Sequence, residues 1–142
     1  MTLAETLAAL HAASFPRGWT AAEFDALLAN PSYKILPTEH GFALLQILPP
    51  EAELISISIL PAHRGHGHGR ALLSQALDAA QSAGITSVFL DVEATNTAAI
   101  ALYHAAGFTE FGRRAGYYAA TDGTSSDAIQ MRLHLPAQSS GK

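Results

Sequence analysis

The chain contains no cysteine among its 142 residues. This absence excludes disulfide bonds, thiolate metal ligands and covalent catalysis through sulfur, so any chemistry must use oxygen, nitrogen or backbone groups. Basic residues are also scarce: eight lysines and arginines stand against twelve acidic residues, for a formal net charge of −4. Because duplex nucleic acid is bound through a basic stripe that neutralises phosphates, we expect no nucleic-acid partner.

Long apolar runs are missing as well. No stretch approaches the roughly 18 uninterrupted apolar residues of a membrane span, and the first residues lack the basic-then-apolar order of a signal peptide. We therefore expect no membrane partner and a cytoplasmic location. The apolar residues that are present, 49% of the chain, suffice for one hydrophobic core. We expect a single domain over residues 1–135 and a flexible polar tail over 136–142.

Hydrophobic periodicity predicts short helices interleaved with strands. Two capping boxes, Thr2 with Glu5 and Thr20 with Glu23, mark the starts of two short helices. Expected strands cover 33–36, 41–48, 53–60, 86–92, 108–113 and 128–135. Two further helices are expected: one ends at Gly84, and the other covers 97–106. The resulting order, αα-βββ-α-β-α-ββ, indicates a mixed α/β domain with a parallel crossover around residues 54–92.

Three glycines stand between an expected strand and an expected helix. Gly65, Gly67 and Gly69 let the backbone approach an anion closely, and the N-terminus of the following helix adds partial positive charge. The run lacks the G-x-G-x-x-G spacing of a dinucleotide fingerprint and the lysine of a P-loop. By itself it is compatible with a phosphate cradle and equally with an ordinary tight turn.

Three histidines in the same run, His63, His66 and His68, admit a metal-binding interpretation because imidazole is a common ligand of transition metals. A flexible glycine loop with no nearby carboxylate or thiolate makes a poorly organised site, however. We therefore expect no metal, and we interpret His66 and His68 as occupants of the variable positions of the loop.

Several motifs together resemble one family. Arg64-x-x-Gly67-x-Gly69 matches the R/Q-x-x-G-x-G/A signature of the GCN5-related N-acetyltransferases, abbreviated GNAT. Further segments resemble the branch of that family that acetylates the N-terminal alanine of ribosomal proteins. These segments are Phe15–Trp19, Leu90–Asn96, Ala99–Tyr103, Gly107-Phe108, Arg113–Tyr118 and Asp127–Met131. The resemblance extends from about residue 5 to about residue 135.

The resemblance implies a fold: a mixed, mostly antiparallel sheet with a central parallel strand pair, flanked by helices. That fold normally opens with a strand before its first helix, whereas the helical pattern here begins at Thr2. We therefore expect the first strand to be missing or short. An exposed sheet edge would favour self-association, so both a monomer and a homodimer remain open.

The resemblance also implies acetyl-coenzyme A (acetyl-CoA) as donor and a primary amine as acceptor. By carry-over, the backbone of Ile57 to Ile59 pairs with the pantetheine arm as an added strand would, and the glycine-rich loop wraps the pyrophosphate. The implied cofactor-binding residues are Ile57, Ser58, Ile59, Arg64, Gly65, His66, Gly67, His68, Gly69, Arg70 and Asn96. Alternatively, Arg70 is a solvated residue at a helix start and Asn96 is a helix N-cap.

Direct attack of an amine on the thioester needs a proton acceptor for the ammonium and a proton donor for the thiolate, but no acyl-enzyme. The expected acid is Tyr103, seven residues after Asn96 on the same helix face; the alternative is a core tyrosine. The expected base is Asp91, which stands where the branch has a glutamate. Glu93 and Glu53 are substitutes, and Asp91 and Glu93 alternatively bind a cationic N-terminus.

The resemblance thus implies an acetyltransferase acting on the N-terminal amine of a ribosomal or other cytoplasmic protein. We expect the segments 15–19 and 114–126 to flank the acceptor groove. Two alternatives are a transferase for small amines or amino acids, and a non-catalytic acyl-CoA sensor, which the altered base position and short N-terminus suggest.

Overall fold

The computed structural model describes residues 2–14, 20–119 and 122–136. Its helices are α1 (Leu3–Ser14), α2 (Ala21–Ala29), the short 3-10 helix η1 (Pro61–His63), α3 (His68–Ser82) and α4 (Thr97–Ala105). Its strands are β1 (Tyr33–Pro37), β2 (Gly41–Leu48), β3 (Glu51–Ile59), β4 (Ser87–Glu93), β5 (Thr109–Ala119) and β6 (Ser125–His134). The predicted order of helices and strands is confirmed.

Both capping boxes form at the predicted helix starts. The backbone N–H of Glu5 donates to the hydroxyl oxygen of Thr2 at 3.1 Å, and the N–H of Thr2 donates to the Glu5 carboxylate at 3.4 Å. Thr20 and Glu23 make the same reciprocal pair at 3.1 and 3.3 Å. These bonds satisfy N–H groups that have no partner within the first helical turn.

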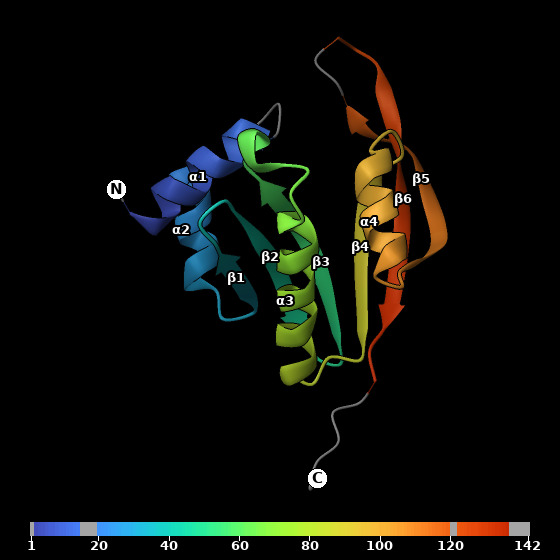
Figure 1. Cartoon of the computed structure of the whole chain (residues 1–142), viewed down its shortest axis with the longest axis horizontal. Helices are drawn as coiled ribbons and strands as arrows, with labels where there is room; N and C mark the ends of the chain where they lie inside the picture. Colours follow the sequence, from blue (N-terminus) through green and yellow to red (C-terminus); the bar gives the residue numbers. More distant parts are fainter. Residues whose placement is uncertain (1, 15–19, 120–121, 137–142) are drawn as a thin grey trace, which may run out of the picture.

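The six strands form one sheet in the order β1-β2-β3-β4-β6-β5, and α3 and α4 lie against one face of it (Figure 1). Helices α1 and α2 cover the other face, over β1, β2 and β3. Strand β2 shows the division: Phe42 and Leu44 pack with Leu7 and Phe24, while Leu45 joins the larger core beneath α3. The side chains of β2 thus contribute to two cores.

The parallel pair β3–β4 splays open. Strands β3 and β4 are in register only where Glu51–Glu53 lies beside Ser87–Phe89. Beyond Glu53, β3 continues to Ile59 in register with β2 alone, and no other described strand pairs with its edge on the β4 side, which we call the free edge of β3. Figure 1 shows the two halves of the sheet diverging there, with α3 on one side of the opening and α4 on the other.

The last two strands are longer than the periodicity predicts. The expected ends at residues 113 and 128 were wrong: β5 runs to Ala119 and β6 begins at Ser125. The register of the two strands shifts between Arg114 and Tyr118, where Gly116 has a φ of +63°. Such a bulge breaks the alternation of side chains that marks a strand in the sequence. Segment 114–126 is therefore largely a hairpin.

Two expectations fall on residues that are not described: the 15–19 segment beside the acceptor groove and most of the 136–142 tail. Within the described residues, no helix is both long and apolar enough to cross a bilayer.

Candidate active site

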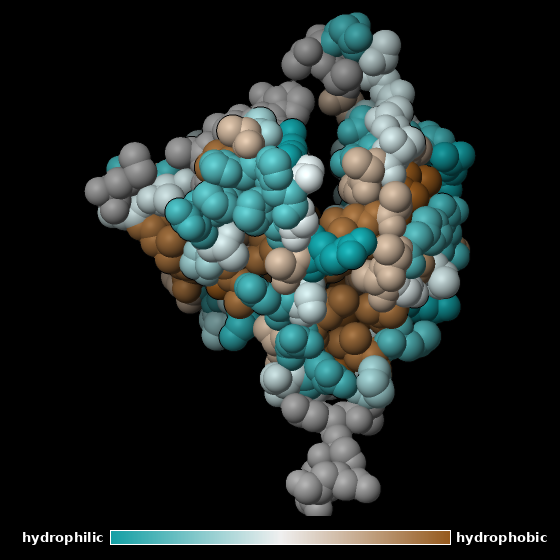
Figure 2. Space-filling view, in the orientation of Figure 1, coloured by the Kyte–Doolittle hydropathy of each residue, from teal (hydrophilic) through white to brown (hydrophobic). Residues whose placement is uncertain are grey.

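A groove follows the opening between the two halves of the sheet, and we call it the cradle groove. It lies between the free edge of β3, the loop before α3 and helix α4, with a cavity volume of about 420 Å³. Figure 2 shows the molecule hollowed between these two halves. The residues that line the cradle groove are Ile57, Ser58, Ile59, His63, Arg64, Gly65, His68, Gly69, Asn96, Ala98, Ala99, Leu102 and Tyr103. Most of the expected cofactor-binding residues therefore lie together.

The glycine-rich loop owes its path to two left-handed residues. Gly65 has φ +81° and Gly67 has φ +83°, a conformation that L side chains rarely adopt. Gly67 is the N-cap of α3, and its carbonyl accepts from the N–H of Ala71 at 3.1 Å. The loop is fastened to β3 because Arg64 Nε donates to the Ile59 carbonyl at 3.0 Å. Helix α3 thus begins at one end of the cradle groove, where its first residues, His68 and Gly69, line the groove.

Three of the expected cofactor-binding residues do not line the cradle groove. His66 and Gly67 are exposed and are absent from its lining. Arg70 is exposed and borders a separate hollow between α3 and α4, together with Leu73 and Leu102. The position of Arg70 agrees with the alternative of a solvated residue at the helix start.

Helix α4 brings Asn96 and Tyr103 to the same groove. The side-chain oxygen of Asn96 accepts from the N–H of Ala99 at 3.1 Å, so Asn96 caps the helix and also lines the groove. The Tyr103 ring packs edge-on against Phe108, with centroids 5.7 Å apart. Burial raises the pKa of Tyr103 to about 12. Its hydroxyl is therefore protonated at neutral pH and is available as a donor.

A second groove lies on the opposite face of the sheet, and we call it the carboxylate groove. Its cavity volume is about 310 Å³. The lining residues are Gln46, Leu48, Glu51, Ala52, Glu53, Phe89, Leu90, Asp91, Phe111, Arg114 and Gln130. Three carboxylates and one guanidinium thus line it, which gives the groove a negative balance. It takes its residues from five strands.

Strand β4 explains why Asp91 lies in the second groove. Burial alternates along Ser87–Glu93, with Val88, Leu90 and Val92 in the core beneath the helices. Asp91 and Glu93 therefore share the opposite face, as the sequence predicts. Glu93 is not part of the groove lining, and its carboxylate accepts from the Ser126 hydroxyl at 2.6 Å. Of the three expected carboxylates, Asp91 and Glu53 line one groove.

The pKa of Tyr118 is influenced by residues from both grooves. Its pKa is raised to about 12, first by burial, then by the negative charge of Asp91 and by Tyr117, Glu93 and Tyr103. These influences come from Asp91 in the carboxylate groove and Tyr103 in the cradle groove. Tyr118 was not among the predicted site residues: it lies in the 114–126 segment expected to flank the acceptor groove, where a tyrosine is more often a core or rim residue than a determinant of specificity.

Two features of the fold define the class of this protein. The only parallel strand pair of the sheet described here splays open, and a glycine-rich loop leads from the free strand edge into a helix at that opening. This arrangement is that of an α/β N-acetyltransferase fold. The model of the acetyltransferase (GNAT) family matches residues 4–108, most of the chain, and the chain belongs to this family. The expected family and fold class are confirmed.

Known proteins support the same assignment. The chain is 42% identical over 95 residues to the [ribosomal protein bS18]-alanine N-acetyltransferase of Escherichia coli K12, which covers 67% of this chain. The crystal structure of the ribosomal-protein-S18-alanine N-acetyltransferase from Escherichia coli superposes with a TM-score of 0.85 and 30% identity, over 98% of this chain and 92% of that one. The structure of a protein from Salmonella typhimurium with its cofactor acetyl-CoA superposes with a TM-score of 0.74 and 26% sequence identity, over 98% of this chain and 87% of that one.

The sequence match to the curated relatives is partial: it spans 64% of the length of the Escherichia coli enzyme.

Proposed function

We propose that this chain is an acetyl-CoA-dependent N-acetyltransferase whose acceptor is the N-terminal amine of a ribosomal or other protein. The supporting observation is the pair of grooves on opposite sides of the splayed β3–β4 pair. One is lined by a glycine-rich loop and a helix N-terminus, the other by carboxylates. The two grooves offer one place for each substrate of a transferase that holds both in a single complex.

The cradle groove suits the donor. Backbone amides at a helix N-terminus bind phosphate without lysines, which fits a chain of net charge −4. Beyond Glu53 no described strand pairs with the edge of β3 that faces β4, so the backbone near Ile57 is placed to pair with an extended pantetheine arm. The groove volume lies within the usual range for small-molecule sites.

The carboxylate groove suits the acceptor. An N-terminal amine arrives as an ammonium ion, and Glu51, Glu53 and Asp91 outweigh the single positive charge of Arg114. The Escherichia coli enzyme described above is named as an N-acetyltransferase for an alanine of ribosomal protein bS18. We extend that acceptor class to this chain: a protein N-terminus that begins with a small residue such as alanine.

The chemistry would proceed in one complex. Asp91 takes a proton from the ammonium, through a water if the carboxylate does not reach directly, and the neutral amine attacks the thioester carbon. The C–N bond forms, the C–S bond breaks, and the coenzyme A thiolate takes a proton from Tyr103. The attacking nitrogen loses its second proton, which restores the Tyr103 hydroxyl, and Asp91 releases the first proton to solvent. Because no enzyme nucleophile is needed, the absence of cysteine is compatible with this route.

A two-panel assay tests the proposal. The protein is incubated with acetyl-CoA and either short peptides that begin with alanine or a set of polyamines and free amino acids, and release of the coenzyme A thiol is followed. We expect turnover with the peptides. The same peptides carrying a blocked N-terminus are the matched control and should give none.

Turnover with small amines alone would overturn the protein-acceptor part of the proposal. Tight coenzyme A binding without turnover on either panel would overturn the catalytic part and support a non-catalytic acyl-CoA sensor.

A further inference from the structure

Three histidines from separate segments meet at one end of the cradle groove. His40 lies in the turn between β1 and β2, His63 ends η1, and His68 begins α3. One ring nitrogen of each lies within 4.8 Å of the other two. The rings of His40 and His63 stack with centroids 3.8 Å apart, and the His68 ring lies 4.7 Å from that of His40. All three side chains are partly buried.

The backbone holds these histidines in place. The N–H of Leu60 donates to the carbonyl of His40 at 2.8 Å, and the N–H of His63 donates to the carbonyl of Leu60 at 2.9 Å. Next to His40, a Cβ on Gly41 would collide with the Ser58 carbonyl oxygen, so only glycine permits this close approach of the two strands. The cluster is therefore built on strand ends that are tied together.

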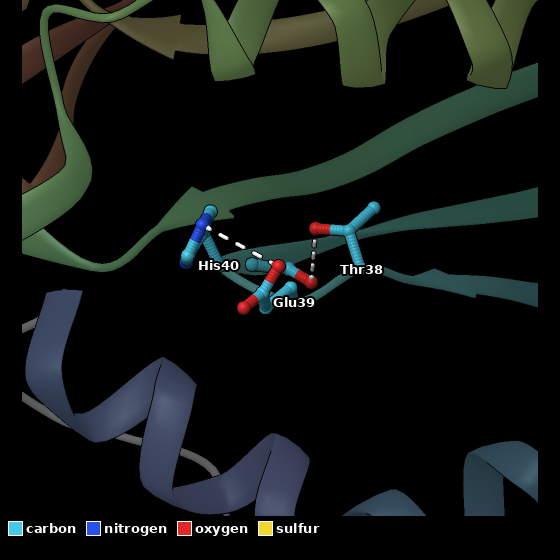
Figure 3. Close-up of polar contacts among 4 residues, drawn as sticks. Thr38, Glu39 and His40 are labelled. Carbon is cyan, nitrogen blue, oxygen red and sulfur yellow. Dashed lines mark hydrogen bonds and ion pairs between the residues drawn. The ribbon is translucent and has the colours of Figure 1, made fainter.

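A carboxylate accompanies the cluster. Glu39 Oε2 lies 3.8 Å from His40 Nε2, and Figure 3 shows this contact in the turn before β2. Histidines that bind metals commonly have a carboxylate beside their second ring nitrogen, which orients the ring. The expectation of no metal rested on a flexible loop without such a carboxylate; His40 and Glu39, from a distant hairpin, provide what the loop lacks.

We propose that His40, His63 and His68 form a three-histidine site for a transition-metal ion such as Zn²⁺. Imidazole nitrogens suit Zn²⁺, Ni²⁺, Cu²⁺ and Co²⁺ and not Mg²⁺ or Ca²⁺, which prefer oxygen ligands. Two nearly parallel stacked rings do not direct nitrogens at one ion, so Zn–N bonds of about 2.0–2.1 Å would require the rings of His40 and His63 to rotate out of their stack. Three ligands leave a fourth position open. This inference does not depend on the proposed function.

Metal binding by the full chain, without a polyhistidine tag, tests the site. The protein is stripped with a chelator and dialysed against Zn²⁺, and a parallel sample is titrated with Co²⁺, whose visible d–d absorption reports tetrahedral coordination. We expect one ion per chain and no displacement by excess Mg²⁺. His40→Gln, His63→Gln and His68→Gln should each weaken Zn²⁺ binding at least tenfold.

Two matched variants separate this cluster from general histidine binding. His66→Gln removes the exposed loop histidine outside the cluster, and His134→Gln removes an exposed histidine on β6. Both should keep the Zn²⁺ affinity within about twofold, and circular dichroism confirms that each variant is folded. No stoichiometric binding by the native chain would overturn the proposal. So would an equal loss in His66→Gln and in the cluster variants.

Discussion

The two grooves of this protein are built in different ways. The cradle groove draws most of its lining from the segment between Ile57 and Gly69 and from one helix, whereas the carboxylate groove takes one to three residues from each of five strands. The first depends on backbone conformation, through glycines and a helix start. The second depends on side-chain charge. The difference implies that binding of the donor should respond to changes in backbone conformation. Binding of the acceptor and proton transfer should respond instead to changes of side chains.

Removing the hydroxyl of Tyr103 should have the largest effect. Tyr103→Phe keeps the ring against Phe108 but removes the proposed proton donor, so kcat should fall by a factor of about 10²–10⁴. The Kd for coenzyme A should stay within about threefold. Tyr33→Phe, in the distant strand β1, is the control and should keep full activity. An unchanged kcat in Tyr103→Phe would remove this residue from the mechanism.

Neutralising the carboxylates one at a time sharpens the assignment of the base. Asp91→Asn should lower kcat by about 10²-fold, as loss of a general base does. Glu53→Gln, in the same groove, should mainly raise KM for a cationic peptide, by less than tenfold. Glu93→Gln should do little, because that carboxylate accepts from Ser126 outside the groove lining. A larger kcat loss in Glu53→Gln than in Asp91→Asn would reverse the assignment.

A glycine pair tests the backbone side of the comparison. Gly65 and Gly84 have φ of +81° and +83°, and a Cβ at either would meet nothing within 4 Å. Alanine at each should cost about 1–2 kcal/mol of backbone strain. Gly65→Ala should weaken coenzyme A binding about tenfold, while Gly84→Ala, at the far end of α3, should leave it unchanged. Calorimetric titration measures both; equal affinities would show that the loop conformation does not matter for binding.

The smallest expected effect is the pH dependence that follows from the raised pKa values of two tyrosines. Tyr103 and Tyr118 should ionise near pH 12 instead of 10, so phenolate absorbance should show a late phase that Tyr103→Phe reduces. Since the folded-state pKa lies above the unfolded one, stability is full below pH 10 and is lost as pH rises toward 12. For Tyr103 the full loss should be about 3 kcal/mol. An early, single-phase titration would contradict the burial of these hydroxyls.

The sequence predicted one groove better than the other. The R-x-x-G-x-G loop, Asn96 and Tyr103 are local signals, and they lie together as expected. The carboxylate groove depends on which strands become neighbours, and no spacing along the chain brings Glu53, Asp91 and Arg114 together. The same reason explains why His40 was missed: it joins His63 and His68 only through the packing of β2 on β3.

Local signals also determined which ends of helices and strands were predicted correctly. The capping boxes fixed helix starts to within a residue, because their bonds are made within four positions. The end of β5 was missed because a bulge at Gly116, held by a bond from its N–H to the Asp127 carboxylate at 3.0 Å, interrupts the alternating pattern. Tyr118 lies just beyond that bulge.

One crystal structure would test the central claim most directly: the protein bound to coenzyme A joined covalently to the N-terminus of an alanine peptide. We expect the coenzyme A part to lie along Ile57–Ile59 and the loop at Gly65, and the peptide to lie over Glu53 and Asp91. A peptide lying instead in the apolar hollow formed by α2, Tyr33 and Ile55 would contradict it, because the two substrates would then not meet through the β3–β4 opening.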